Sequence, residues 1–195
     1  MLELRRHSPL TERSAAGALA VLVAGTVRLE ELDAAVAVVR CAPRQGEAVA
    51  AVVAQACGWM LPRVPNTVVV QPHSRALWVE PGAWLITGQR HAVTAALAAL
   101  RGLAESASLL TADVTGGRCM IGVSGPGARA LIQSGCPLDL HPRVFTPGRC
   151  ATSLFNEISL VIDQLSDAPA YTLIADSALA LTLWDQLADA ARWLE

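Results

Sequence analysis

Apolar runs and turn residues follow one another along the chain in an order that predicts strand pairs followed by helices. The runs RALWV and WLITG flank the turn sequence EPGA, which is typical of a hairpin. The runs SLLTADV and RCMIGVS flank the turn residues Thr115-Gly116-Gly117, and CATSLFNEISLVI and AYTLIA flank DQLSDAP. We therefore expect three hairpins, one from each pair of runs.

Helical periodicity follows each predicted hairpin. RHAVTAALAALRGLA and ARALIQSG follow the first two, and RQGEAVAAVVAQACG forms an earlier helix that Gly58 closes. The last helix should begin after Asp176 or Ser177, because either residue is a competent N-cap. Its apolar stripe, typical of a helix with one buried face, consists of Leu179, Leu183 and Leu187.

This rhythm predicts an α+β fold in which repeated hairpin-helix units form mostly antiparallel sheets backed by helices. The strand-helix-strand piece at 84–114 resembles half of a ferredoxin-like unit. The segment 59–74, with three prolines, should be extended and mostly irregular. We expect residues 1–16 to form an N-terminal arm and 17–195 a single domain, with two pseudo-symmetric halves as an open alternative.

The composition leaves few charges for the surface. Hydrophobic residues make up 53% of the chain and charged residues 16%, against about 25% charged in an average soluble domain. A surface that packs against a partner would explain this, since large apolar patches mark interaction sites. A coding bias toward Ala, Gly and Arg is the alternative explanation.

The basic residues exclude several function classes. All fifteen are arginines and the chain has no lysine, which excludes Schiff-base chemistry and lysine-dependent phosphate loops. The net charge is −2 and the arginines are scattered, so we expect no nucleic-acid partner.

The apolar run at 14–27 is too short to span a bilayer, and the sequence begins with Met. Five cysteines, an odd number, contain no C-x-x-C pair. That pattern is typical of reduced thiols, and we expect a cytoplasmic protein with no membrane partner.

The stretch MIGVSGPGARALIQSGCPLDL raises the question of a ligand loop or a nucleophile turn. Gly125, Gly127 and Ala130 fit the dinucleotide pattern G-x-G-x-x-A, but the acidic residue expected about 20 positions later is absent. Ser124 begins a nucleophile elbow, yet Pro126 replaces the final glycine that the elbow needs. The stretch is best interpreted as a turn between a strand and a helix.

A zinc site is conceivable from Cys136, Asp139, His141 and Cys150, but their spacing matches no common zinc motif. We expect a rigid connection instead, in which Cys136 and Leu138 pack inward and Asp139 caps backbone amides. The sequence therefore predicts no catalytic, cofactor-binding or metal-ligating residue on this chain.

Several of these motifs form a recognisable set. LPRVPNT (61–67), WVEPGAWLI (78–86) and VSGPGARALIQSGCPLDLHPRVFTPG (123–148) resemble the gamma subunit family of heterotetrameric sarcosine oxidase, as do ATSLFNEISLVI and ADSALALTLWDQL. The block SGCPLDLHP is the most specific. The resemblance covers about residues 40–190.

This resemblance implies a fold like the folate-binding domain of the aminomethyltransferases. It also implies a complex that demethylates sarcosine to glycine, reduces O2 to hydrogen peroxide and passes the one-carbon unit to tetrahydrofolate. FAD, FMN, NAD, tetrahydrofolate and zinc would belong to the alpha, beta and delta partner subunits. The gamma subunit itself would be non-catalytic.

Alternatives remain open. The chain could serve a related N-methyl amine oxidase or dehydrogenase complex, or be a stand-alone folate-binding protein. Trp59, Arg63 and Asn66, in the proline-rich segment, are the candidate partner contacts.

Overall fold

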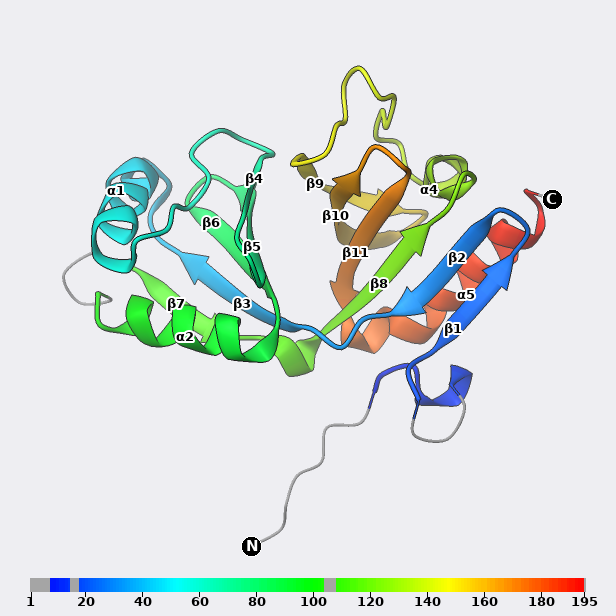
Figure 1. The fold of residues 1–195 in the computed structure, drawn as a ribbon, viewed down its shortest axis with the longest axis horizontal. Helices are drawn as coiled ribbons and strands as arrows, with labels where there is room; N and C mark the ends of the chain where they lie inside the picture. The colour runs from blue at the N-terminus through cyan, green and yellow to red at the C-terminus, as the bar shows by residue number, and fades with distance from the viewer. Residues whose placement is uncertain (1–7, 15–17, 104–107, 195) are drawn as a thin grey trace, which may run out of the picture.

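Two antiparallel sheets face one another, and helices cover the outer surface of each (Figure 1). The computed structural model describes residues 8–14, 18–103 and 108–194. The six-strand sheet has the order β1 (Val21–Ala24), β2 (Val27–Glu31), β8 (Arg118–Ser124), β11 (Ala170–Asp176), β10 (Ile158–Ser166), β9 (Cys150–Phe155). The five-strand sheet has the order β4 (Val68–Val70), β5 (Ser74–Glu80), β6 (Ala83–Gly88), β3 (Ala35–Arg40), β7 (Leu110–Asp113).

Each sheet has its own pair of helices. The five-strand sheet packs against α1 (Gly46–Cys57) and α2 (Arg90–Arg101), and the six-strand sheet against α4 (Ala128–Gly135) and α5 (Ala180–Arg192). Short 3-10 turns connect several elements: η1 (Thr11–Arg13), η2 (Pro43–Gln45), η3 (Thr115–Gly117) and η4 (Ser177–Leu179). None of the helices in the described ranges has the length and apolar character that crossing a membrane requires.

Each sheet has an apolar core on its helical side, and a third apolar core lies between the sheets. It contains buried side chains from both: Val36, Leu77, Leu85, Met120, Cys150 and Ile174. Full burial of one aliphatic side chain stabilises a fold by about 1.5–3 kcal/mol. The inter-sheet core therefore contributes directly to holding the two sheets together.

The chain order of the elements repeats. One run is β2-β3-α1-β4-β5-β6-α2 and the other is β7-β8-α4-β9-β10-β11-α5. The first strand of each run lies in the sheet built by the other, because β2 pairs with β8 and β7 pairs with β3. The exchange interlocks the two runs, so neither sheet is complete without a strand from the other run.

The predicted α+β class with mostly antiparallel sheets is confirmed, since every strand pairing in the described residues is antiparallel. The first hairpin is confirmed with Trp78 opposite Trp84. In the 84–114 piece, β6 and β7 flank β3 on either side, as in a split β-α-β unit. Gly58 ends α1 at φ 69°, and the Asp176 carboxylate accepts a hydrogen bond from the Ala178 N–H.

The second predicted hairpin is wrong. β7 and β8 lie in different sheets, and the turn between them takes the chain from one sheet to the other. The Thr115 hydroxyl accepts a hydrogen bond from the Val36 N–H and donates one to the Val36 carbonyl, at 2.9 and 3.2 Å. These bonds attach the turn to β3, and β3 takes the place beside β7 that the hairpin would have given to β8.

Two further strand assignments need correction. The run CATSLFNEISLVI is two strands, β9 and β10, because Asn156 adopts a left-handed φ of 49° and turns the chain. The hairpin of β1 and β2 was not predicted, since VLVA has apolar residues on both faces and shows no alternation. Leu179 is 41% exposed because it lies in η4, ahead of the helix whose stripe it was expected to join.

Residues 8–14 of the predicted arm pack on the six-strand sheet and α5. Leu10 is fully buried in the core between them. The Ser8 hydroxyl donates to the Glu31 carboxylate, and the Arg13 guanidinium donates to both oxygens of Asp185 at 2.8 and 2.7 Å. Residues 1–7, 15 and 16 of that arm lie outside the described part of the chain.

Candidate functional site

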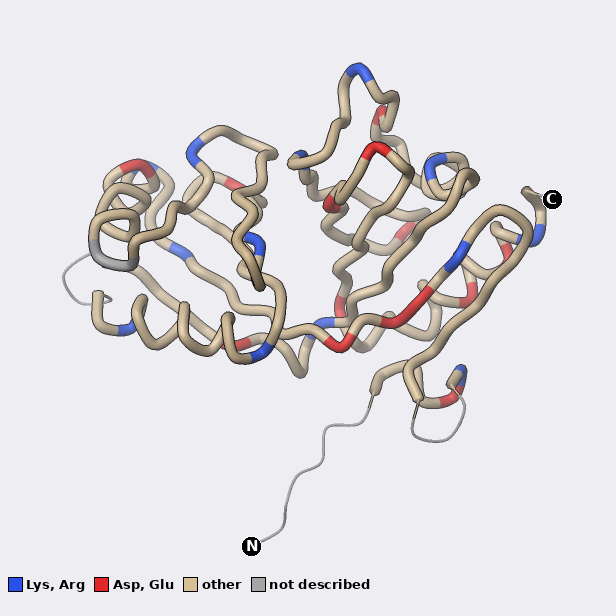
Figure 2. The backbone as a smooth tube through the Cα atoms, in the orientation of Figure 1, with Lys and Arg blue, Asp and Glu red and all other residues tan. Residues whose placement is uncertain are grey.

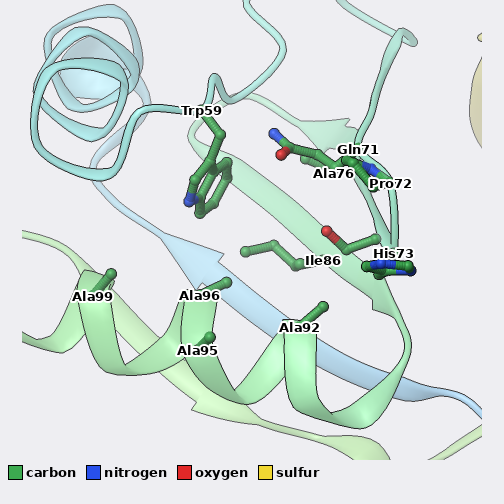
Figure 3. Close-up of a pocket in the computed structure, with 11 residues that line it drawn as sticks. Trp59, Gln71, Pro72, His73, Ala76, Ile86, Ala92, Ala95, Ala96 and Ala99 are labelled. Atoms are coloured by element: carbon green, nitrogen blue, oxygen red, sulfur yellow. The ribbon is translucent and has the colours of Figure 1, made fainter.

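A cavity of about 340 Å³ lies on the helical side of the five-strand sheet (Figure 3). Trp59 forms one wall and Ile86 of β6 part of another. The α2 wall consists of small side chains, which leave the space open: Ala92, Ala95, Ala96 and Ala99. Trp59 is half-buried and packs against the core of this sheet. The cavity suits an apolar group.

Polar groups border the cavity at one end only. Gln71, His73 and Ser74 come from the turn that enters β5. The rings of His73 and His91 lie 5.4 Å apart and tilted, and both side chains are exposed. Of the described residues that line the cavity, none is a carboxylate or a thiol. The arrangement can hold an apolar side chain but lacks an acid-base pair.

A second cavity of about 280 Å³ lies between the sheets. Its polar lining includes Arg118 and the ion pair of Arg40 with Glu80, whose Nη2 and Oε1 atoms are 2.6 Å apart. Its remaining walls are largely aliphatic side chains of both sheets. The cavity lies beside the inter-sheet core.

The three candidate contact residues occupy different environments. Trp59 faces the first cavity, Arg63 is exposed, and Asn66 adopts a left-handed φ of 60°. The Asn66 carbonyl accepts a hydrogen bond from the Cys150 N–H at 3.1 Å, so its backbone connects the two sheets. The structure therefore places only Trp59 at the cavity.

The tip of the β1–β2 hairpin packs closely against the Gly125-Pro126-Gly127 turn. A Cβ at Gly125 would lie 2.3 Å from the Thr26 carbonyl oxygen, and one at Gly127 would lie 2.4 Å from the Thr26 hydroxyl. Gly125 also has a φ of 105°. The glycines thus allow a close approach of two chain segments. The Thr26 carbonyl also accepts a hydrogen bond from the Gly127 N–H at 3.3 Å, so this amide of the turn is already paired and does not face a ligand.

The residues of the rejected zinc hypothesis are not brought together. Cys136 lies in the core under α4, whereas Cys150 lies between the sheets. The Asp139 carboxylate accepts the His141 N–H at 2.9 Å, which confirms its predicted capping role. Leu138 packs inward with Cys136 as predicted. In the described ranges, no three potential metal ligands form a cluster.

The Cys150 thiol is buried between the two sheets. Burial raises its pKa to about 12, and the nearby Asp163 charge adds to the effect. Its Sγ donates to the carbonyls of Thr67 and Trp78. A thiol protonated at neutral pH is a poor nucleophile and a poor metal ligand.

An ion pair that sequence reasoning missed joins the two sheets. Arg75 of β5 binds Asp163 of β10 through both carboxylate oxygens, with Nε–Oδ2 and Nη2–Oδ1 distances of 2.5 and 2.7 Å. Burial raises the pKa of Asp163, and the Arg75 guanidinium opposes that rise. The two residues are 88 positions apart in the sequence, so no local pattern could have revealed the pair.

Comparison with known proteins identifies the family. Residues 42–192, most of the chain, match the sarcosine oxidase, gamma subunit family. The chain belongs to this family. The sarcosine oxidase subunit gamma of Corynebacterium sp. (strain P-1) is 33% identical over an alignment of 175 residues that covers 86% of this chain and 81% of that protein. The sarcosine oxidase subunit gamma of Arthrobacter sp. is 31% identical, and the alignment again covers 86% of this chain and 81% of that protein.

Solved structures share the fold of this chain. A chain of the heterotetrameric sarcosine oxidase from Corynebacterium sp. U-96 aligns with a TM-score of 0.82 and 25% identity, covering 97% of this chain and 95% of that one. Glycine cleavage system aminomethyltransferase T from Bartonella henselae aligns with a TM-score of 0.62 at 10% identity, over 87% of this chain and 47% of that one. The predicted aminomethyltransferase-like fold is confirmed.

Proposed function

We propose that this gamma-family chain is a non-catalytic structural subunit of a heterotetrameric sarcosine oxidase complex. The observation that supports this most directly is the match of nearly the whole chain to a chain of a heterotetrameric sarcosine oxidase. The complex would convert sarcosine, O2 and tetrahydrofolate to glycine, hydrogen peroxide and methylene-tetrahydrofolate. FAD, FMN, NAD, tetrahydrofolate and zinc would be held by the alpha, beta and delta subunits.

The chemistry of the chain supports a structural role. It has no lysine, and the Cys150 thiol has its pKa raised to about 12 by burial. Neither cavity offers an acid-base pair of the kind that catalysis at neutral pH uses: the first has no carboxylate, and the Glu80 carboxylate in the second is paired with Arg40.

The surface supports a role in assembly. Large hydrophobic side chains with more than half of their surface in water include Val23, Met60, Val64, Val144 and Trp193. Apolar and aromatic side chains of this kind are enriched in the centres of protein interfaces. In an assembled complex, partner subunits would cover these side chains, so that they contact water only when the subunit is alone.

The test is assembly and turnover of the co-produced complex. The chain is produced with an affinity tag beside its alpha, beta and delta partners, and the purified material is examined for co-purifying subunits and flavin absorbance. We expect all four subunits and sarcosine-dependent peroxide formation. If the tagged chain were recovered from these cells without any of the co-produced subunits, the proposal would be contradicted.

Steady-state kinetics across N-methyl amines identify the substrate of the complex. We expect the highest kcat/KM for sarcosine, and a much higher value for another N-methyl amine would assign the chain to a related oxidase or dehydrogenase.

We also infer a cytoplasmic location from the reduced cysteine pattern. Cell fractionation tests this, and recovery outside the cytoplasm would refute it.

A further inference from the structure

Two irregular loops lie on the same side of the molecule and meet where they lead into β4 and β9. The first, residues 59–67, leads from α1 to β4, and the second, residues 136–149, leads from α4 to β9; we call them the loop pair (Figure 1). Thr67 and Arg149 form a β-bridge between them. The Val68 N–H, directly after the first loop, donates to the Gly148 carbonyl at 2.8 Å. The two loops are thus fixed against each other at their ends.

The loop pair has prolines that restrict its backbone and side chains that anchor it in the cores. Leu61, Leu140 and Phe145 lie in the cores beneath the loops. The Trp84 indole N–H donates to the Pro62 carbonyl at 2.8 Å. The prolines of the loop pair are Pro62, Pro65, Pro137, Pro142 and Pro147.

Apolar side chains on these anchored loops are exposed to water. Met60 is 57% exposed, Val64 60% and Val144 57%. A surface that is already ordered loses little conformational entropy when a partner binds, which favours affinity. Exposed apolar groups on an ordered loop are therefore suited to docking.

The loop pair is basic although the whole chain is acidic. It contains Arg63, Arg143 and Arg149 against the single carboxylate of Asp139, so its net charge is 3 − 1 = +2 with histidine neutral, whereas the chain has −2. Figure 2 shows a basic position at the outermost point of the second loop. Within the described ranges, neither Arg63 nor Arg143 forms an ion pair, and both are exposed.

We propose that the loop pair is the docking surface for a partner subunit that presents carboxylates around an apolar centre. The partner's apolar side chains cover Met60, Val64 and Val144, and its carboxylates pair with Arg63 and Arg143. Guanidinium groups bind carboxylates through two parallel hydrogen bonds, which gives such a contact orientation as well as energy. The inference rests on the proposed function and adds the surface and the chemistry of the partner.

Charge reversal in the assembled complex tests the proposal. The variant Arg63→Glu/Arg143→Glu is co-produced with the partner subunits beside the control Arg90→Glu/Arg101→Glu. The control makes the same charge change at the two exposed ends of α2, where Arg101 forms no ion pair in the described ranges and Arg90 comes no nearer than 4.0 Å to Asp33. We expect the loop variant to bind its partners about 30-fold more weakly or worse, and the control to bind as the unmodified chain does.

A second variant and a salt series guard against misfolding. Val64→Ser/Val144→Ser removes the apolar centre without changing charge, and circular dichroism verifies that both variants fold. For the unmodified complex, affinity should fall as salt rises toward about 1 M, where the Debye length is about 3 Å. In Arg63→Gln/Arg143→Gln, that salt dependence should be much weaker.

The outcomes separate the two proposals. If the unmodified chain assembles with its partners and both loop variants assemble equally well, the docking surface is wrong and the proposed function stands. If the unmodified chain does not assemble at all, the proposed function is wrong. If the loop variants abolish only self-association of the chain, the surface binds a second copy, which would also overturn the inference.

Discussion

Replacing Arg75 by methionine removes the cation from the ion pair that joins the two sheets. The Asp163 side chain is 2% exposed and the Arg75 side chain 21%. Because water barely reaches the carboxylate, the variant leaves a buried charge without a partner. Losing one member of such a pair costs about 3–5 kcal/mol. We expect the free energy of unfolding of Arg75→Met to fall by about that amount.

The pH dependence of this loss has a definite sign. Burial raises the pKa of Asp163, and Arg75 lowers it in the native chain, so the pKa of Asp163 should rise further in the variant. A carboxyl whose folded pKa exceeds its unfolded value destabilises the fold increasingly as pH rises from the unfolded to the folded pKa. The loss of unfolding free energy that this raised pKa causes grows by about 1.36 kcal/mol per pH unit in that range. It should therefore disappear as pH falls toward about 4.

Urea unfolding followed by tryptophan fluorescence measures both effects. The control is Arg40→Met, which breaks the exposed Arg40–Glu80 pair and should cost about 1 kcal/mol or less. The double variant Arg75→Met/Asp163→Leu should recover most of the loss, since an apolar pair can replace a buried ion pair. Equal losses in Arg75→Met and Arg40→Met, or no change with pH, would refute the reasoning.

Three further changes have clear expected results. Gly125→Ala puts a Cβ 2.3 Å from a backbone oxygen at a φ of 105° and should lower the free energy of unfolding in urea by more than about 1 kcal/mol, whereas Gly116→Ala, with no atom within 4 Å, should not. Cys150, whose pKa is about 12, should resist iodoacetamide at pH of about 8 until urea unfolds the chain; rapid labelling of the folded chain would argue against its burial. Arg13 lowers the pKa of Asp185, so this pair stabilises the fold above the carboxyl pKa of the unfolded chain and stops doing so as pH falls through the folded pKa. The melting temperature of Arg13→Gln should therefore approach that of the unmodified chain in acid. A difference that stays constant with pH would count against the pair.

Local patterns predicted the elements that local interactions determine. The alternation around EPGA identified β5 and β6, and Gly58 marked the end of α1, because turns and caps depend on adjacent residues. Asp176 caps the 3-10 turn η4, and α5 begins three residues after the first position that the cap predicted. The same logic failed at Thr115–Gly117, where the turn signal was real but its strands pair with distant partners. Long-range pairing leaves no trace in a short window of sequence.

The candidate site was predicted in part. The prolines around Arg63 predicted an extended, mostly irregular segment, and Trp59 was singled out on the segment where it lines a cavity. The alanine wall of α2 gave no signal, because small residues on a helix usually indicate only close packing. The Arg75–Asp163 pair and the contact between the two loops depend on the stacking of the sheets, which no motif encodes. As partner contacts, Trp59, Arg63 and Asn66 stay predictions.

Isolation of the chain by itself tests the central claim most directly. The purified chain is examined for flavin absorbance and for sarcosine-dependent peroxide formation, and is then added to a preparation of the alpha, beta and delta subunits made without it. The account predicts no bound flavin and no turnover in the isolated chain, and recovery of an active complex when it is added. A monomeric chain that binds flavin or oxidises sarcosine unaided would contradict it.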